Sequence, residues 1–208
     1  SYLSNGSEPF RIPDLSELPK FEVPPLPPPE EYKPYMRDPG TLARPWAHAG
    51  LKGYEHRLGG LEKQDVTGAI SYDALNHERM TQLRAEKTAG VAKEIPPTKI
   101  YGDPEGDLLV AGWGSTYGAI KLAVTEARKA GLKVSSIHVR HMNPLPPDLG
   151  VIMRRFRKVL VPEENSGQFR LLLRSACMVE PVGLNKVQGQ PLNQEEVLEK
   201  IKDVLRGN

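Results

Sequence analysis

The stretch that decides the fold is "DLLVAGWGSTYGAIKLAVTEARKAGLKVSSIHV", residues 107–139. It begins with an apolar run closed by glycine, continues with Ala, Ile, Leu and Val at helical spacing, and ends in a second apolar run. This order predicts a strand over 107–112, a helix over 115–131 and a strand over 133–139. A strand, a helix and a strand joined by short turns form a β-α-β unit, whose two strands lie in one parallel sheet.

The same alternation continues to the C-terminus. "LGVIMRRFRKVLVPEEN" (149–165) predicts a short helix and a third strand, and "SGQFRLLLRSA" (166–176) predicts another helix. "CMVEPV" (177–182) predicts a fourth strand, and "NQEEVLEKIKDVLRG" (193–207) a capped C-terminal helix. The expected fold is therefore α/β, with a mostly parallel sheet and helices on both faces.

Proline sets the N-terminal organisation. Eleven of the twenty prolines fall within residues 1–50, which we expect to be a Pro-rich extended arm or linker, because each ring fixes φ and removes a backbone donor. Either a disordered linker or an arm ordered on another surface fits this composition. Residues 51–97 are expected to form a polar loop and a connecting helix, with Asp73 as its cap. Residues 98–208 are expected to form the α/β domain.

Composition narrows the function classes. Lys and Arg total 28 against 26 for Asp and Glu, and a net charge of +2 argues against nucleic acid or a membrane surface as a partner. The one cysteine, Cys177, excludes an internal disulfide and a cysteine-ligated metal cluster formed by this chain alone. No uncharged apolar run is long enough for a membrane span, and "SYLSNGSEPF" does not resemble a signal peptide. We therefore expect a soluble, cytoplasmic protein.

The glycine-rich turn after the first predicted strand is a candidate phosphate site. Gly112, Gly114 and Gly118 follow a strand and open a helix, where backbone donors can hold an anion. Their spacing is G-x-G-x-x-x-G, however, whereas the dinucleotide fingerprint is G-x-G-x-x-G. Ser115 also lacks the G-x-S-x-G context of a nucleophile elbow. A tight turn that requires small residues is the favoured interpretation.

Polar side chains follow the next two predicted strands at the carboxyl edge of the sheet, where α/β folds bind ligands. Arg140 and His141 are candidates for a crevice at this edge, whereas His138 is interpreted as a core residue. One strand later, a second group can either cap the following helix or contact a ligand or partner in the same crevice. This group is Glu163, Glu164, Asn165 and Gln168.

Five blocks of the chain, in order, resemble one family. They are "LARPWAHAGLKGYEHRLGGLEKQDVTGAISYDALNHERM", "EGDLLVAGWGSTYGAI", "HVRHMNPLPPDLG", "KVLVPEENSGQ" and "NKVQGQPL". Together they resemble the C-terminal part of the alpha subunit of 2-oxoglutarate:ferredoxin oxidoreductase, also called 2-oxoacid:acceptor oxidoreductase. "SYLSNGSEPFRIP", residues 1–13, resembles the segment that leaves the pyrimidine-binding domain of these subunits. The resemblance runs almost from end to end and implies that residues 98–208 form a domain like the C-terminal domain of transketolase.

The resemblance also implies an activity for the assembled enzyme. Such enzymes decarboxylate a 2-oxoacid on thiamine diphosphate, pass electrons through an iron–sulfur cluster to ferredoxin, and transfer the acyl group to coenzyme A. The beta subunit binds the diphosphate and Mg²⁺ and carries the cluster, and the remainder of the alpha subunit activates thiamine. The resemblance therefore implies no cofactor on this chain, no turnover by the chain alone, and an (alpha beta)2 assembly. Another 2-oxoacid as substrate, or a self-sufficient protein that binds a small ligand or nucleotide, remains an alternative.

The resemblance also bears on the polar stretch "HRLGGLEKQDVTGAISYDALNHERM", residues 56–80. Since thiamine is activated elsewhere in such enzymes, a structural and interface loop is favoured over a catalytic centre, and no proton-transfer role is assigned. The alternative is that its side chains reach a neighbouring active site, where cations bind a dicarboxylate or the phosphates of coenzyme A. The candidates for that role are His56, Arg57, Lys63, Gln64 and His77.

Overall fold

The computed structural model describes residues 12–18, 20 and 23–207. The chain divides into two compact units, with the boundary after Arg84. The expected resemblance of residues 1–13 to the segment that leaves a pyrimidine-binding domain lies almost wholly outside the described residues.

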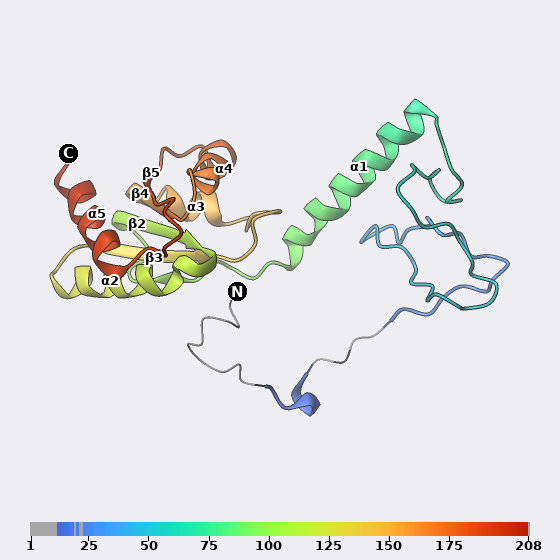
Figure 1. Ribbon diagram of the computed structural model, residues 1–208, viewed down its shortest axis with the longest axis horizontal. Helices are drawn as coiled ribbons and strands as arrows, with labels where there is room; N and C mark the ends of the chain where they lie inside the picture. The colour runs from blue at the N-terminus through green and yellow to red at the C-terminus, as the bar shows by residue number, and fades with distance from the viewer. Residues whose placement is uncertain (1–11, 19, 21–22, 208) are drawn as a thin grey trace. The chain divides into compact units, whose positions relative to one another are not determined.

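The second unit is built on a five-stranded sheet in the order β1-β3-β2-β4-β5 (Figure 1). Three neighbouring pairs, β2–β3, β2–β4 and β4–β5, are parallel, and β1 is antiparallel to β3. The strands are β1 (Ile100–Tyr101), β2 (Gly106–Trp113), β3 (Val134–Val139), β4 (Phe156–Glu163) and β5 (Val182–Asn185). The helices are α2 (Tyr117–Lys129), α3 (Leu149–Met153), α4 (Gln168–Cys177) and α5 (Gln194–Arg206).

The central strand β2 separates two apolar clusters. Leu108 and Val110 pack with α2 and α5 on one face, whereas Leu109 and Ala111 pack with α3 and α4 on the other. All four side chains are fully buried, because consecutive residues of a strand point to opposite faces. The predicted α/β class, with a mostly parallel sheet and helices on both faces, is confirmed (Figure 1).

Two strands differ from the prediction. Residues 177–182 do not form the fourth strand: Cys177 is still the last residue of α4, and Met178 ends that helix with a left-handed φ of 53°. The strand begins only at Val182, where pairing with Leu160 of β4 begins. β1 was not predicted, because its two residues pair only through backbone contacts with β3 and carry no period of their own.

Capping side chains mark the first turns of α1 and α5 at their predicted positions. Asp73 accepts a hydrogen bond from the Leu75 amide (3.0 Å) at the start of α1 (Ala74–Gly90), as expected. Asn193 and Glu196 form a reciprocal capping box at the start of α5. A short 3-10 turn, η2 (Val91–Glu94), follows α1 before the two prolines at 96 and 97.

The described residues of the first unit are largely coil, apart from the 3-10 turn η1 (Leu15–Glu17) and most of α1. The Pro-rich segment contacts the polar loop within this unit. The Tyr54 hydroxyl donates to the Pro27 carbonyl (2.7 Å), and the Tyr35 amide donates to the Val66 carbonyl (3.0 Å). The buried Tyr32 ring packs edge-on against Tyr54, with ring centroids 5.0 Å apart. These contacts, rather than regular secondary structure, hold the described coil together.

Within the described part of the chain, no helix combines the length and the apolar character needed to cross a membrane.

The glycine-rich turn generates a prediction about packing. A Cβ at Gly112 would meet Ile120 Cδ1 and Thr116 Oγ1, whereas a Cβ at Gly118 would meet nothing within 4 Å. We expect Gly112→Ala to lower the free energy of unfolding by about 1–3 kcal/mol, because Ile120 is buried and must move. Gly118→Ala, within α2, should raise it by about 0.5–1 kcal/mol. Chemical denaturation of both variants tests this, and equal effects would contradict the packing argument.

Candidate functional site

The polar stretch 56–80 folds into a tight loop followed by the first turns of α1. An isolated antiparallel bridge joins Lys63 to Ile70, and the Gln64 amide donates to the Ala69 carbonyl (2.7 Å). These contacts turn the chain back on itself within a few residues. The loop is thus held by its own backbone before any side chain is considered.

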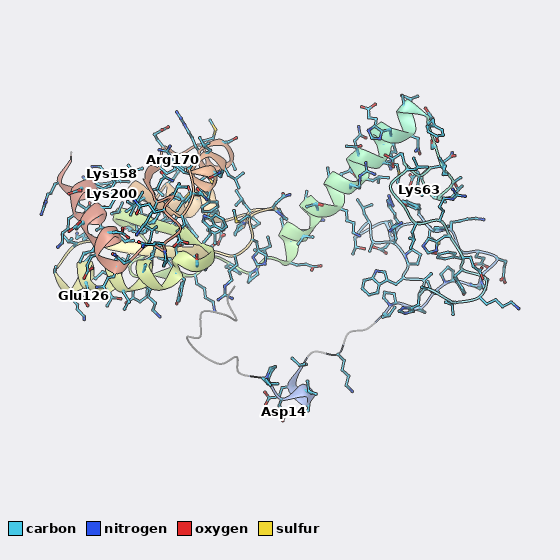
Figure 2. The ribbon with its side chains drawn as sticks, in the orientation of Figure 1. Asp14, Lys63, Glu126, Lys158, Arg170 and Lys200 are labelled. Atoms are coloured by element: carbon cyan, nitrogen blue, oxygen red, sulfur yellow. The ribbon has the colours of Figure 1, made fainter. Side chains whose placement is uncertain are left out.

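Lys63 lies inside this loop (Figure 2). Its side chain is buried, with the residue only 2% exposed, and its ammonium donates to the carbonyls of Gly59 (3.1 Å) and Leu61 (2.5 Å). Among the described residues, no carboxylate lies within ion-pair distance of it. Because carbonyl dipoles of the loop solvate the charge, Lys63 acts as an internal donor of the loop.

Asn76 fastens the loop to α1. Its amide nitrogen donates to the Lys63 carbonyl (3.0 Å), and its amide oxygen accepts from the Asp65 amide (2.9 Å). An amide side chain can satisfy one backbone donor and one acceptor, as a neighbouring strand would. Asn76 is not among the predicted site residues, although an Asn in the first turn of a helix, just after a coil, is a recognisable signal for such a contact.

The Glu62 carboxylate contacts two side chains of α1, His77 and Arg84. Its carboxylate lies 2.7 Å from His77 Nδ1 and 3.3 Å from Arg84 Nη1. Hydrogen bonding to His77 is the largest cause that lowers the pKa of Glu62 below its usual value, followed by the contact with Arg84. His77 therefore makes a contact within its own unit.

The other loop candidates are dispersed. His56 Nδ1 lies 2.9 Å from the Tyr54 carbonyl and 3.4 Å from the Tyr32 hydroxyl, next to the Pro-rich segment. Arg57 and Gln64 are exposed, and no side-chain partner is found for Arg57 among the described residues. Within this unit the five predicted loop residues therefore do not gather at one ligand site: His56, Arg57, Lys63, Gln64 and His77.

At the carboxyl edge of the sheet, Glu163 caps α4. This fully buried carboxylate, at the end of β4, accepts hydrogen bonds from the amides of Phe169 (2.8 Å) and Arg170 (3.1 Å). The Asn165 side chain accepts from the amides of Gly167 (2.7 Å) and Gln168 (3.3 Å). The amide donors at this helix end are thus used within the chain, and the Gln168 side chain is exposed.

Glu164 joins two loops at the same edge. Its carboxylate accepts a hydrogen bond from Ser115 Oγ (2.9 Å) and another from the Leu192 amide (2.9 Å). Ser115 thus donates to a carboxylate, and no imidazole partner is found for it among the described residues. The contact links the turn after β2 to the loop that precedes α5.

Arg140 and His141 line a separate groove along β3, which we call the basic groove. It has a volume of about 410 Å³ and lies wholly within the second unit. Its lining consists of residues 95–101, Tyr117, Ile120, Lys121, residues 136–141 and Pro146. Glu163, Asn165 and Gln168 do not line it, so the two predicted groups at the carboxyl edge do not share one crevice.

His138 is half-buried on the wall of the basic groove rather than enclosed in the core. Its ring packs edge-on against Tyr117, with centroids 5.1 Å apart. Burial, and secondarily the positive charge of Arg140, lower the pKa of His138. Alternation along β3 gave a signal: Ile137 and Val139 face one apolar cluster, which turns His138 to the opposite face.

Comparison with known proteins decides the family. No protein-family model matches the chain. It is 42% identical over 207 residues to the 2-oxoglutarate oxidoreductase subunit KorA of Mycobacterium tuberculosis, a match that covers 99% of this chain and 31% of that protein. The chain belongs to the alpha-subunit family of 2-oxoacid:ferredoxin oxidoreductases.

Two further matches agree with this family and with a C-terminal portion of the subunit. The alpha subunit of 2-oxoacid:ferredoxin oxidoreductase from Saccharolobus solfataricus is 29% identical over 151 residues, which cover 70% of this chain and 24% of that one. The solved 2-oxoglutarate:ferredoxin oxidoreductase of Magnetococcus marinus superposes with a TM-score of 0.76 and 28% identity, over 84% of this chain and 31% of that one. The chain thus spans about a third or less of these relatives' length.

The burial of Lys63 predicts a local loss of stability. We expect Lys63→Met to weaken the loop by about 1–2 kcal/mol, because the carbonyls of Gly59 and Leu61 lose their ammonium donor. Amide hydrogen exchange of residues 62–71 measures this. Arg57→Met is the matched control, since Arg57 is exposed, and should change protection by less than about 0.5 kcal/mol. A larger effect from Arg57 than from Lys63 would contradict the assignment.

The Glu62 contacts predict a dependence on pH. Because the folded-state pKa of Glu62 lies below the usual 4.5, its contribution is complete above that value and is lost as the pH falls through the folded pKa. Amide NMR signals of residues 62–71 should therefore shift in acid below about pH 4.5. Glu62→Gln should remove this acid transition, whereas Glu78→Gln, at an exposed position of α1, should preserve it. A transition unchanged in Glu62→Gln would refute the role of this carboxylate.

Proposed function

We propose that this chain forms part of the alpha subunit of an enzyme that oxidatively decarboxylates 2-oxoglutarate. The proposed reaction converts 2-oxoglutarate, coenzyme A and oxidised ferredoxin into succinyl-CoA, CO₂ and reduced ferredoxin. The observation that carries the proposal is the 42% identity to a 2-oxoglutarate oxidoreductase subunit over nearly the whole chain. The superposition on an enzyme with 2-oxoglutarate, coenzyme A and succinyl-CoA bound supports the same substrates.

In this proposal the cofactors bind elsewhere in the complex. The chain contains one cysteine, Cys177, which is buried, whereas a cysteine-ligated cluster needs several. Within the described ranges, no group of three or more His, Cys, Asp or Glu side chains is placed to hold a metal ion. A single buried cysteine does not suit an iron–sulfur cluster, and in this proposal no chemical step of the reaction falls on this chain.

The proposed contribution of the chain is assembly and the shaping of the active-site surroundings. Three charged side chains that could serve in catalysis, Lys63, Glu62 and Glu163, instead form contacts within their own units. The exposed Arg57 and Gln64 are available for contacts with the remainder of the alpha subunit or with a beta subunit, in an (alpha beta)2 complex in the cytoplasm. No residue of this chain is given a proton-transfer role.

The proposal is tested by purifying the enzyme through a tag on this chain and measuring reduction of ferredoxin or a viologen dye. We expect reduction that requires both coenzyme A and 2-oxoglutarate, with kcat/KM at least tenfold higher than with pyruvate. The chain by itself should give no turnover. Arg57→Ala should weaken assembly or raise KM without lowering the melting temperature of the chain.

Three outcomes count against this proposal. Preference for another 2-oxoacid would keep the family and overturn the substrate. Turnover by the chain alone would overturn the assignment of the chemistry to the rest of the complex. Purification of the chain without any other subunit from cells that express it at its natural level would favour a self-sufficient ligand-binding protein.

A further inference from the structure

The basic groove differs from the rest of the chain in its charge. The chain is nearly neutral, with 28 basic and 26 acidic residues, yet the groove is lined by Lys99, Lys121 and Arg140 and by no Asp or Glu. Two imidazoles, His138 and His141, add further nitrogen atoms to the lining. A groove walled by one sign of charge attracts an anion more strongly than an open surface does.

The cations of the groove are not neutralised within the chain. No ion pair is found for Lys99, Lys121 or Arg140 among residues 12–18, 20 and 23–207. Asp148 lies close in sequence to the lining residue Pro146, but its carboxylate accepts hydrogen bonds from the Thr98 amide (2.8 Å) and hydroxyl (2.7 Å). Asp148 keeps its negative charge beside Thr98, but the three cations Lys99, Lys121 and Arg140 outnumber it, so the groove retains an excess of positive charge.

Aromatic rings stand beside these cations. Lys121 Nζ lies 5.6 Å from the ring centroid of Tyr117 and 5.9 Å from that of Tyr101. The Tyr117 ring contacts His138 at 5.1 Å, so Lys121, Tyr117 and His138 form a continuous series along the groove. Tyr117 is half-exposed, and its ring can therefore contact a planar group of a ligand.

The size of the groove favours a small molecule over a protein segment. Its volume of about 410 Å³ lies within the usual range of small-molecule sites, which is about 300–1,000 Å³. Ile120 of α2, which lies on the same face of the sheet as His138, is only 3% exposed and gives the groove an apolar side chain. A small groove lined by several cations suits a compact anion better than a peptide lying across a flat surface.

We infer that the basic groove binds a small ligand that carries a phosphate group and a planar ring, a molecule of the nucleotide class. Lys121 and Arg140 would pair with the phosphate, and the Tyr117 ring would contact the planar group. The inference rests on the groove alone and does not depend on the proposed enzymatic activity.

Titration calorimetry of the purified chain with adenosine 5′-diphosphate, adenosine and inorganic pyrophosphate tests the inference. We expect adenosine 5′-diphosphate to bind at least tenfold more tightly than adenosine, and to weaken as salt is raised, because the attraction is ionic. Lys121→Gln and Arg140→Gln should each weaken this binding at least fivefold. Tyr117→Leu should weaken the binding of adenosine 5′-diphosphate but change the affinity for pyrophosphate less than twofold.

The matched control is Arg155→Gln, which removes the same charge from an exposed position outside the groove and should change binding less than twofold. Equal loss in Arg155→Gln and Arg140→Gln would overturn the site, as would the absence of binding at millimolar adenosine 5′-diphosphate. Binding of a glutamate-rich peptide that is sensitive to Arg140→Gln, without nucleotide binding, would instead identify an acidic protein segment as the occupant. Each result is independent of whether the complete enzyme oxidises 2-oxoglutarate.

Discussion

Double burial of β2 is the constraint on which the second unit depends. Leu108 and Val110 need one apolar cluster, and Leu109 and Ala111 need another, so both faces of the sheet must be covered by helices. The parallel strands β2, β3 and β4 are joined by crossover connections that contain these helices, and parallel pairing brings their carboxyl ends to one edge. Glycine at position 112, near the end of β2, follows from the same constraint, since the chain must leave a buried strand and pack a helix directly against it.

At that carboxyl edge the polar groups divide into two kinds. Glu163 and Asn165 satisfy the free amides at the start of α4, and a buried helix end without such acceptors would be costly. For Arg140 and Lys121, no ion pair is found in the described chain, and both residues line a groove rather than a helix end. Residues that look equivalent in sequence, each just past a strand, therefore differ in whether their polar atoms are already used.

In the first unit, side chains form hydrogen bonds with backbone groups that would be paired within a sheet or helix elsewhere. The described coil has few backbone ladders, so its carbonyls and amides need other partners. Lys63 supplies donors to two carbonyls, and the Asn76 amide pairs with one backbone donor and one acceptor. Much of this charged stretch, which suggests catalysis in the sequence, therefore stabilises the loop's own backbone. A structural role agrees with a chain that covers under a third of the length of its relative in this subunit family.

The sequence by itself determined the strands and helices of residues 107–139, the ends of the long helices at Asp73 and Asn193, and the family, because periodicity, caps and ordered motifs are local properties of the chain. Only the tertiary structure decided that β1 pairs with β3, that Lys63 points inward, and that His138 and Lys121 share a groove with Arg140. These facts depend on residues distant in sequence, and the burial and pairing of a polar group are set by those distant neighbours rather than by its own type.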